Sequence, residues 1–268
     1  MSLFLRSTAA KPDTKADVLL THGLGEHSAR YGHVAAFFAQ NGFRFCAYDL
    51  RGHGRSGGLR GHIHQYADLI DDLDSVLKHY KREGVPMFLY GHSLGAQITL
   101  NYLLQRHPHV AGAILTSPWL ALAFHPSRLK VLLAKLLHAF WPTFTQTTFD
   151  NPAALSRDLV FLASLAEQKL VHHKMSARMY GEALAGAARV GAASSGFGCP
   201  LLLIHGGDDP LTSAAATESF FRSLCEPDKT LKIYPGMRHE TQNEIGRETV
   251  LSDMVEWMNK RVPGPQRA

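Results

Sequence analysis

The sequence predicts an α/β fold in which a mostly parallel sheet is covered by helices on both faces. Short apolar runs alternate along the chain with longer segments whose apolar residues recur at helical spacing. Some of the runs are continuously apolar, as at residues 201–204, which is typical of strands that are buried on both faces of a sheet. Alternation of this kind indicates βα units, which build parallel sheets.

Each element can be placed from its periodicity. The chain has 268 residues, which suits one α/β core with an insertion. Residues 1–116 and 199–262 are expected to form the core, residues 117–198 a helical cap, and residues 263–268 a flexible tail. Strands are expected near residues 18, 44, 87, 112, 201 and 229, and helices over residues 29–41, 65–83, 94–107, 213–224 and 248–261.

The alternation of strands and helices breaks at residues 117–198. This segment lacks a convincing buried strand and has the pattern of several short helices. It follows the apolar run 112–116, so it leaves the sheet at the carboxyl ends of the strands, where functional groups gather in folds of this class. We therefore expect it to cover the active site.

The most apolar part of this segment is residues 129–141, where ten of thirteen side chains are apolar and the polar ones share one sector of a helix. Such a helix can pack on the core, line an acyl tunnel, or rest on a lipid surface. The segment is too short to span a bilayer. Its candidate substrate-contacting side chains are Leu132, Leu136 and Phe140.

The pentapeptide at residues 91–95 reads Gly-His-Ser-Leu-Gly and stands between an apolar run and a helical segment. A chain that passes from strand to helix in so few residues must turn sharply, and the middle residue then projects its hydroxyl from the turn. Glycines on both sides avoid collisions with the packed strand and helix. The pattern predicts that Ser93 is a nucleophile.

A serine hydroxyl needs a base, and the base needs an acid that orients it. In folds with this kind of turn, the acid and then the histidine follow the serine along the chain. Asp208 and Asp209 follow one apolar run and His239 follows the next, so these side chains are expected to meet Ser93 at the carboxyl edge of the sheet. Spacing alone does not choose between the two aspartates.

The apolar run that begins at Val18 leads into a glycine-rich loop, His-Gly-Leu-Gly-Glu-His at residues 22–27. In acyl transfer, a loop at this place supplies one backbone N–H to the oxyanion, and the residue after the nucleophile supplies the other. We assign these donors to Leu24 and Leu94. The histidines of the loop lack regular metal-ligand spacing, so neither a metal nor a cofactor is expected.

The composition favours an ordinary globular protein, with 45% hydrophobic and 19% charged residues. Its three cysteines make no disulfide framework, and it has no signal-peptide pattern, so a cytoplasmic location is expected. The net charge of +5 would help peripheral contact with an anionic membrane through the cap, but it is small. Nucleic-acid binding is not expected, because the basic residues form no dense run with interleaved aromatics.

Several segments together resemble a known family. Residues 22–31, HGLGEHSARY, resemble the signature loop of monoacylglycerol lipases and bacterial lysophospholipases. Residues 49–56, DLRGHGRS, resemble the next loop of that family, and the pentapeptide and residues 205–209, HGGDD, continue the resemblance. It implies the α/β-hydrolase fold with a helical cap, and it extends over the chain from about Val18 onward.

The resemblance also implies roles for single residues. It makes Ser93 the nucleophile, Asp209 the triad acid and His239 the base, with the Leu24 and Leu94 N–H groups as the oxyanion hole. One departure is the short segment before Val18, which implies that the first strand or two are missing or reduced to residues 3–6. A second is Ala96, where the family often has glycine.

These observations predict a serine hydrolase that cleaves the ester of a single-chain lipid through an acyl-enzyme, without a cofactor or metal. A general carboxylesterase and a phospholipase A are alternatives with the same machinery. An aminopeptidase would need a cap carboxylate for the substrate amine, for which Glu167 and Glu182 are candidates. A catalytically silent lipid-binding protein is the alternative of a different class. The sequence does not predict the oligomeric state.

Overall fold

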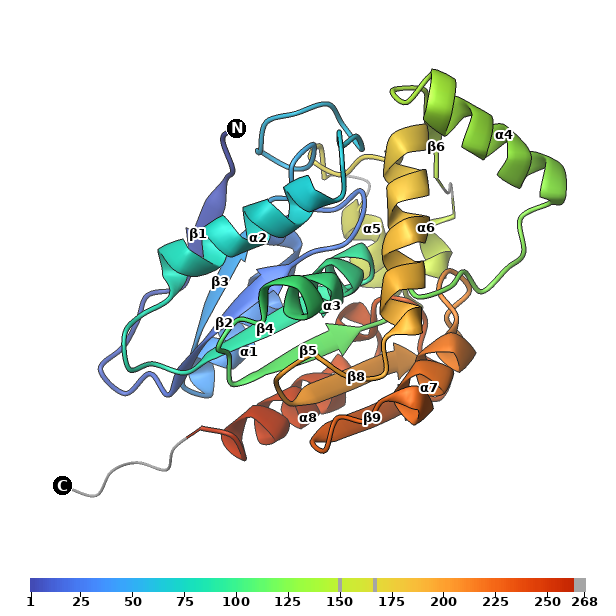
Figure 1. Ribbon diagram of the computed structural model, residues 1–268. Coiled ribbons are helices and arrows are strands. Elements are labelled where there is room, and N and C mark those ends of the chain that lie inside the picture. Colours follow the sequence, from blue (N-terminus) through green and yellow to red (C-terminus); the bar gives the residue numbers. More distant parts are fainter. Residues whose placement is uncertain (149–150, 166–167, 263–268) are drawn as a thin grey trace.

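The structure is a computed structural model that describes residues 1–148, 151–165 and 168–262. Its centre is a seven-stranded sheet in the order β1-β3-β2-β4-β5-β8-β9 (Figure 1). Only β1 is antiparallel to its neighbour, and the other strand pairs of this sheet are parallel. The strands are β1 (Leu5–Ser7), β2 (Ala16–Thr21), β3 (Phe43–Tyr48), β4 (Met87–His92), β5 (Gly112–Thr116), β8 (Leu201–Gly206) and β9 (Lys229–Tyr234).

All six strands expected from the sequence are present, so the predicted α/β fold with a mostly parallel sheet is confirmed. The amino-terminal strand is reduced as expected, but it begins at Leu5 rather than at residue 3. The predicted flexible tail, residues 263–268, lies outside the described residues.

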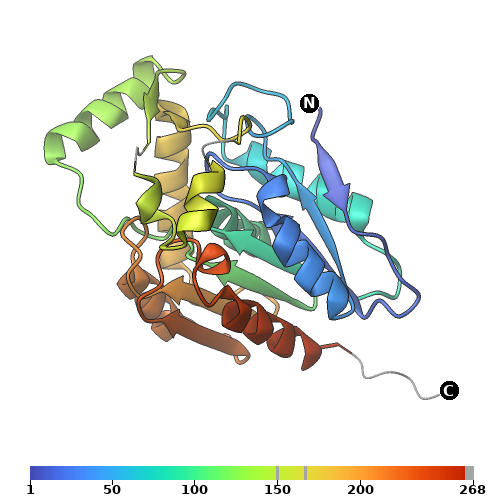
Figure 2. The ribbon, with the colours of Figure 1, turned by 180° about the vertical axis from the view of Figure 1, so that it is seen from behind.

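Helices cover both faces of the sheet, as Figures 1 and 2 show from opposite sides. The strand residues alternate between two cores, so Leu89 faces one and its neighbours Phe88 and Tyr90 face the other. Burial on both faces explains why these strands are continuously apolar. The helices α2 (Ala67–Tyr80), α3 (Leu94–Arg106) and α7 (Ala214–Ser223) pack on one face, and α1 (Gly32–Gln40) and α8 (Arg247–Asn259) on the other.

The segment between β5 and β8 forms the predicted insertion, but it differs from the expected set of short helices. It contains a two-stranded antiparallel sheet, and its last helix is sixteen residues long. The sequence did not predict these strands, because each has three residues and all three residues of β6 are exposed. The elements are α4 (Arg128–Phe140), β6 (Thr145–Thr147), α5 (Leu159–Leu165), β7 (Lys174–Ser176) and α6 (Ala177–Ala192).

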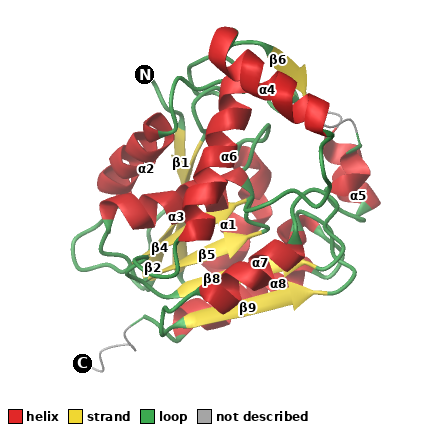
Figure 3. Ribbon diagram, turned by 45° about the vertical axis from the view of Figure 1, so that its right-hand side comes forward, coloured by secondary structure: helices red, strands yellow, loops and turns green. Residues whose placement is uncertain are grey.

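The insertion is fixed to the core through α6 and through a backbone hydrogen bond. Met179, Ala183 and Val190 of α6 are buried in the same core as the strands, whereas α4 packs beside α6 at the outer edge of the molecule (Figure 3). The N–H of His172 donates to the carbonyl of Gly25 at 2.9 Å. A side chain at Gly25, which has φ +82°, would collide with the His172 carbonyl. The insertion therefore lies directly over the loop that follows β2.

Candidate active site

Ser93 occupies a sharp turn between β4 and α3. Its backbone angles, φ 53° and ψ −116°, are strained for a residue with a side chain. The turn needs the glycines on either side, because a Cβ on Gly91 would lie 2.5 Å from the Cα of Ala96, and one on Gly95 would lie 2.0 Å from the carbonyl oxygen of Thr21. The turn places Ser93 at the edge of the sheet, on the wall of a pocket that lies between the core and the insertion.

Asp209 and His239 lie on the loops that follow β8 and β9. The Nδ1 of His239 donates to Oδ2 of Asp209 at 2.7 Å, and both side chains are buried. The neighbouring Asp208 is exposed, and only its backbone N–H contacts the histidine loop, at the carbonyl of Met237. The fold thus selects Asp209 as the carboxylate that reaches the histidine. The helix α7 is capped by Ser213, whose side chain accepts the N–H of Ala216.

The electrostatics of this pair favour a charged carboxylate. Burial would raise the pKa of Asp209, but His239 and a second histidine, His205, hold it well below its usual range. Burial would also lower the pKa of His239, but the Asp209 charge and hydrogen bond raise it above its ordinary value. The ring therefore accepts a proton readily while Asp209 remains ionised.

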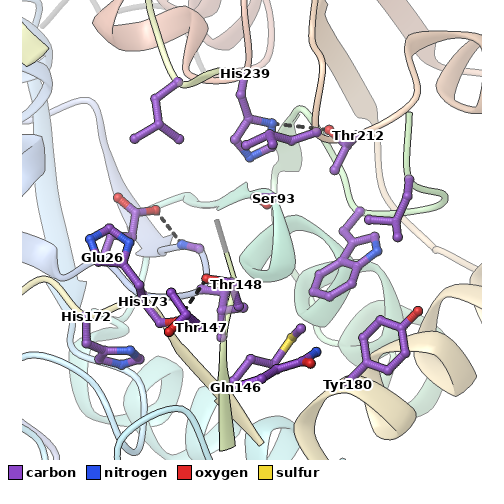
Figure 4. Close-up of a pocket in the computed structure, with 18 of the residues that line it drawn as sticks. Glu26, Ser93, Gln146, Thr147, Thr148, His172, His173, Tyr180, Thr212 and His239 are labelled. Atoms are coloured by element: carbon purple, nitrogen blue, oxygen red, sulfur yellow. Dashed lines mark hydrogen bonds between the residues drawn. The ribbon is translucent and has the colours of Figure 1, made fainter. Parts of the chain in front are cut away.

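Ser93 and His239 line the same pocket, and Figure 4 shows both side chains among the residues that surround it. No hydrogen bond joins them in the described part of the chain, which is common in sites without substrate. His92, inside the turn, bonds Thr116 at 3.0 Å and is buried, and burial lowers its pKa well below the ordinary value. His92 is therefore a neutral packing residue.

Two backbone N–H groups beside Ser93 are available to a ligand. Those of Leu24 and Leu94 have no hydrogen-bond partner among the described residues. The loop of Leu24 is clamped at Gly23, whose N–H donates to Glu26 at 2.5 Å and whose carbonyl lies 2.8 Å from Nδ1 of His22. The loop is therefore fixed before any ligand binds, as an oxyanion site requires.

A buried ionic cluster joins this loop to the histidine loop. Arg30 donates to Glu26 at 3.1 Å and to Glu240, next to His239, at 2.7 Å. Through these contacts Glu26 and Arg30 hold the loop in place. Arg51, on the loop after β3, pairs with two aspartates of α2. Glu240 gave no sequence signal of its own, because its partner lies 210 residues away.

The pocket above Ser93 is a cavity of about 560 Å³ between the core and the insertion. Apolar side chains such as Trp119, Leu122 and Phe144 form much of its wall. Gln146, Thr147, Thr148, His172 and His173 add polar groups to the part that the insertion contributes (Figure 4). A mostly apolar pocket with a few polar groups suits an amphiphilic ligand.

The side chains that α4 contributes to this pocket are not those expected from the sequence. Leu133, Ala134 and Leu137 line it, together with Lys130. The three residues named from the sequence are exposed and absent from the lining, with exposed fractions of 55% for Leu132, 49% for Leu136 and 85% for Phe140. This corrects their assignment to the pocket wall. Successive residues of a helix differ by a rotation of about 100° about its axis, so a change of one residue points to a different side of the helix. Composition alone did not fix which side of α4 faces the pocket.

The sequence gave no signal for two residues that touch the Asp209 carboxylate. The Thr212 hydroxyl donates to Oδ2 at 2.7 Å, and Nε2 of His205 lies 3.0 Å from the same oxygen. Both are buried and lie within four residues of Asp209. Within the described ranges, no group of three or more histidine, cysteine or acidic side chains has the arrangement of a metal site.

Residues 12–246 match the family profile described as Serine aminopeptidase, S33. The chain belongs to this family. It is 36% identical, over 97% of its length, to an uncharacterised abhydrolase domain-containing protein of Dictyostelium discoideum, of which it spans only 28%. A monoacylglycerol lipase of Mycolicibacterium smegmatis is 31% identical, with 92% of this chain and 90% of the relative aligned.

The fold comparison agrees with the family. The crystal structure of a monoacylglycerol lipase of Paleococcus ferrophilus superposes with a TM-score of 0.89 at 29% identity, covering 97% of this chain and 100% of the other. The fold is that of the α/β-hydrolases, and the resemblance to the monoacylglycerol lipase branch stated from residues 22–31 and 205–209 is confirmed.

Proposed function

We propose that the protein hydrolyses the carboxylic ester of a single-chain lipid, such as a monoacylglycerol or a lysophospholipid, and releases the fatty acid. One observation carries the proposal: Ser93 stands on a strained turn in a mostly apolar pocket that also holds the His239–Asp209 pair. The activity named for the relatives from Mycolicibacterium smegmatis and Paleococcus ferrophilus supports a lipid substrate over a soluble ester.

In this proposal Ser93 attacks the ester carbonyl while His239 accepts its proton. Asp209 keeps the tautomer with the hydrogen on Nδ1, so Nε2 is free to accept, and it stabilises the imidazolium that forms. The N–H groups of Leu24 and Leu94 bind the oxyanion, each contributing about 3 kcal/mol. His239 then protonates the leaving alcohol. Water activated by the same ring hydrolyses the acyl-enzyme, so the chain needs no metal or cofactor for these steps.

The proposed cap, residues 117–198, would hold the acyl chain against the inner side of α4, which presents Leu133 and Leu137. The polar groups at residues 146–148 and 172–173 would face the head group. This places an apolar chain and a polar alcohol on different walls of one cavity. A short soluble ester would leave most of the apolar wall unoccupied, so chain length distinguishes a lipase from a general esterase.

The outer side of α4 supports a second proposal, that the protein contacts a membrane at its surface. Leu129, Phe140 and Trp141 have exposed fractions of 75%, 85% and 58%. No helix in the described ranges is long and apolar enough to cross a membrane. An amphipathic helix of this kind lies in the plane of the lipid surface. We propose a cytoplasmic protein that takes its substrate from such a surface.

An aminopeptidase is less consistent with the pocket. The two acids that line it, Glu26 and Glu240, are committed to Arg30. Of the acids considered from the sequence, Glu182 bonds the backbone of Tyr66 and is not part of the pocket wall. Glu167 lies outside the described residues. The described pocket therefore offers no uncommitted carboxylate for a substrate amine.

The test is hydrolysis of p-nitrophenyl esters of increasing acyl length, with the wild type beside Ser93→Ala. The proposal expects turnover that is highest with medium or long chains and lost in the variant, followed by release of fatty acid from monoacylglycerols and lysophospholipids. A preference for the shortest esters would favour a general carboxylesterase. Release of fatty acid from two-chain phospholipids at a higher rate would favour a phospholipase A. No turnover of any ester would refute the proposal.

A further inference from the structure

We propose that His205 is a positioning residue: it shares the Asp209 carboxylate with His239 and limits how strongly that carboxylate attracts a proton on the catalytic ring. His205 is the fifth residue of β8, is fully buried, and has no access to the pocket. It acts only through Asp209. The inference rests on the proposed function, because it concerns the base of that reaction.

The contacts of Asp209 show how the carboxylate is shared. Oδ1 accepts the N–H groups of Leu211 at 2.8 Å and Thr212 at 3.1 Å. Three groups meet at Oδ2, namely Nδ1 of His239 at 2.7 Å, the Thr212 hydroxyl at 2.7 Å and Nε2 of His205 at 3.0 Å. A carboxylate oxygen offers two lone pairs, so three donors compete for them.

The surroundings of His205 decide which of its nitrogens carries a hydrogen. Nε2 faces two acceptors, Oδ2 of Asp209 and the carbonyl of Thr212 at 3.1 Å, so it must carry one. Nδ1 lies 2.8 Å from the Thr217 hydroxyl, which donates to it in the neutral ring. His205 is therefore held as a hydrogen-bond donor toward Asp209, with an alternative acceptor beside it.

This donor has a consequence for His239. A hydrogen bond to a carboxylate disperses its charge, so Oδ2 attracts the imidazolium of His239 less strongly while His205 is bound to it. The other titratable groups near His239 are His92, whose ring centre is 5.0 Å away, and Glu26 and Glu240, whose charges raise the pKa of His239. Arg30 pairs with both glutamates.

A substitution at His205 leaves those other groups in place, so their effects cancel when the variant is compared with the wild type. Loss of the donor then raises the pKa of His239, and the ring becomes protonated at a higher pH. In the wild type, by contrast, His205 keeps the base neutral, and so able to accept the Ser93 proton, over a wider range of pH.

The experiment compares His205→Phe, which fills the site without a donor, with His205→Gln, whose amide can donate at the position of Nε2. Thr217→Val is the matched control, because it removes a buried hydrogen bond to the same ring and leaves Nε2 on Asp209. The measurements are the pH profile of kcat/KM for a p-nitrophenyl ester, the NMR titration of the His239 ring, and thermal unfolding.

In His205→Phe, the midpoint of the acid limb of the kcat/KM profile and the NMR midpoint of His239 should both rise by about one pH unit, the size of shift that one lost hydrogen bond to a charged group produces. In His205→Gln the midpoint of the acid limb should equal that of the wild type. Thr217→Val should lower stability without moving this midpoint. If the phenylalanine variant does not fold, His205→Leu carries the same expectation.

The proposal is overturned if the limb and midpoint of the donor-free variant coincide with those of the wild type, or if the glutamine variant shifts equally. Loss of stability alone would then mean a purely structural role. A wild type without esterase activity would instead refute the proposed function, and the NMR midpoints would still decide the role of His205.

Discussion

Replacement of Asp209 by asparagine separates the role of its charge from that of its shape. Oδ1 accepts two backbone N–H groups, from Leu211 and Thr212. In Asp209→Asn the amide oxygen must therefore stay at this position, because an NH₂ group there would face two donors. The amide NH₂ is then forced to the position of Oδ2, where it faces Nδ1 of His239.

An NH₂ group at that position reverses the hydrogen bond. It donates to Nδ1 of His239, so the hydrogen of the ring moves to Nε2, and this nitrogen can no longer accept the Ser93 proton. The variant also loses the charge that stabilises the imidazolium. A wrong tautomer in a triad of this kind lowers kcat by about ten-thousand-fold, or about 5 kcal/mol in the barrier.

The assay is kcat/KM with a p-nitrophenyl ester, and the matched control is Asp208→Asn. Asp208 is exposed and holds the histidine loop only through its backbone N–H, so its variant should keep activity within about twofold, as surface substitutions usually do. Thermal unfolding checks that both variants are folded. The reasoning is refuted if the Asp209 variant keeps more than about a tenth of the wild-type activity.

Three further outcomes follow from the site and the cap. Because the pKa of His239 is raised, kcat/KM should fall with decreasing pH at a midpoint above the ordinary value of about 6.5, and a pH profile with a lower midpoint would contradict this. Ser93→Gly should be inactive. Its free energy of unfolding, measured by chemical denaturation, should exceed that of Ser93→Ala by about 1 kcal/mol, because glycine adopts φ 53° without strain. Equal free energies of unfolding would mean that the turn stores no backbone strain. Phe140→Ser should weaken binding to anionic vesicles about tenfold in a sedimentation assay, whereas Leu59→Ser, at an exposed position outside the cap, should not; equal effects would argue against α4 as the contact.

The sequence predicted those parts of the molecule that are specified locally. The strand, turn and helix around Ser93 follow one another in the chain, and the continuously apolar strand sequences indicate burial on both faces of the sheet. Ser93, Asp209 and His239 could be placed together from the sequence, because each follows a parallel strand of the same sheet. Spacing alone did not separate Asp209 from Asp208, the resemblance implied Asp209, and in the fold the turn after β8 buries Asp209 and exposes Asp208.

The parts that escaped prediction depend on contacts that no local pattern encodes. The side of α4 that faces the pocket depends on how the helix packs against α6. The sequence therefore named Leu132 and Leu136, whereas the neighbouring Leu133 and Leu137 line the pocket. In the sequence, His205 was identified only as the first residue of the segment 205–209, without a role of its own. Its contact with Asp209 depends on the side-chain directions at the end of β8, which the sequence does not state.

The arrangement of Arg30 explains why the site can be rigid although its members are spread over the whole chain. One guanidinium bonds Glu26, which accepts the N–H of Gly23, and Glu240, which follows His239. The proposed oxyanion loop and the proposed base are thereby held by one buried cation. A buried ion pair adds little net stability, because the desolvation of its charges offsets their attraction. Its benefit is geometric: donors that are fixed before the substrate binds need no reorganisation during the reaction, and this preorganisation supplies much of the rate enhancement in acyl transfer.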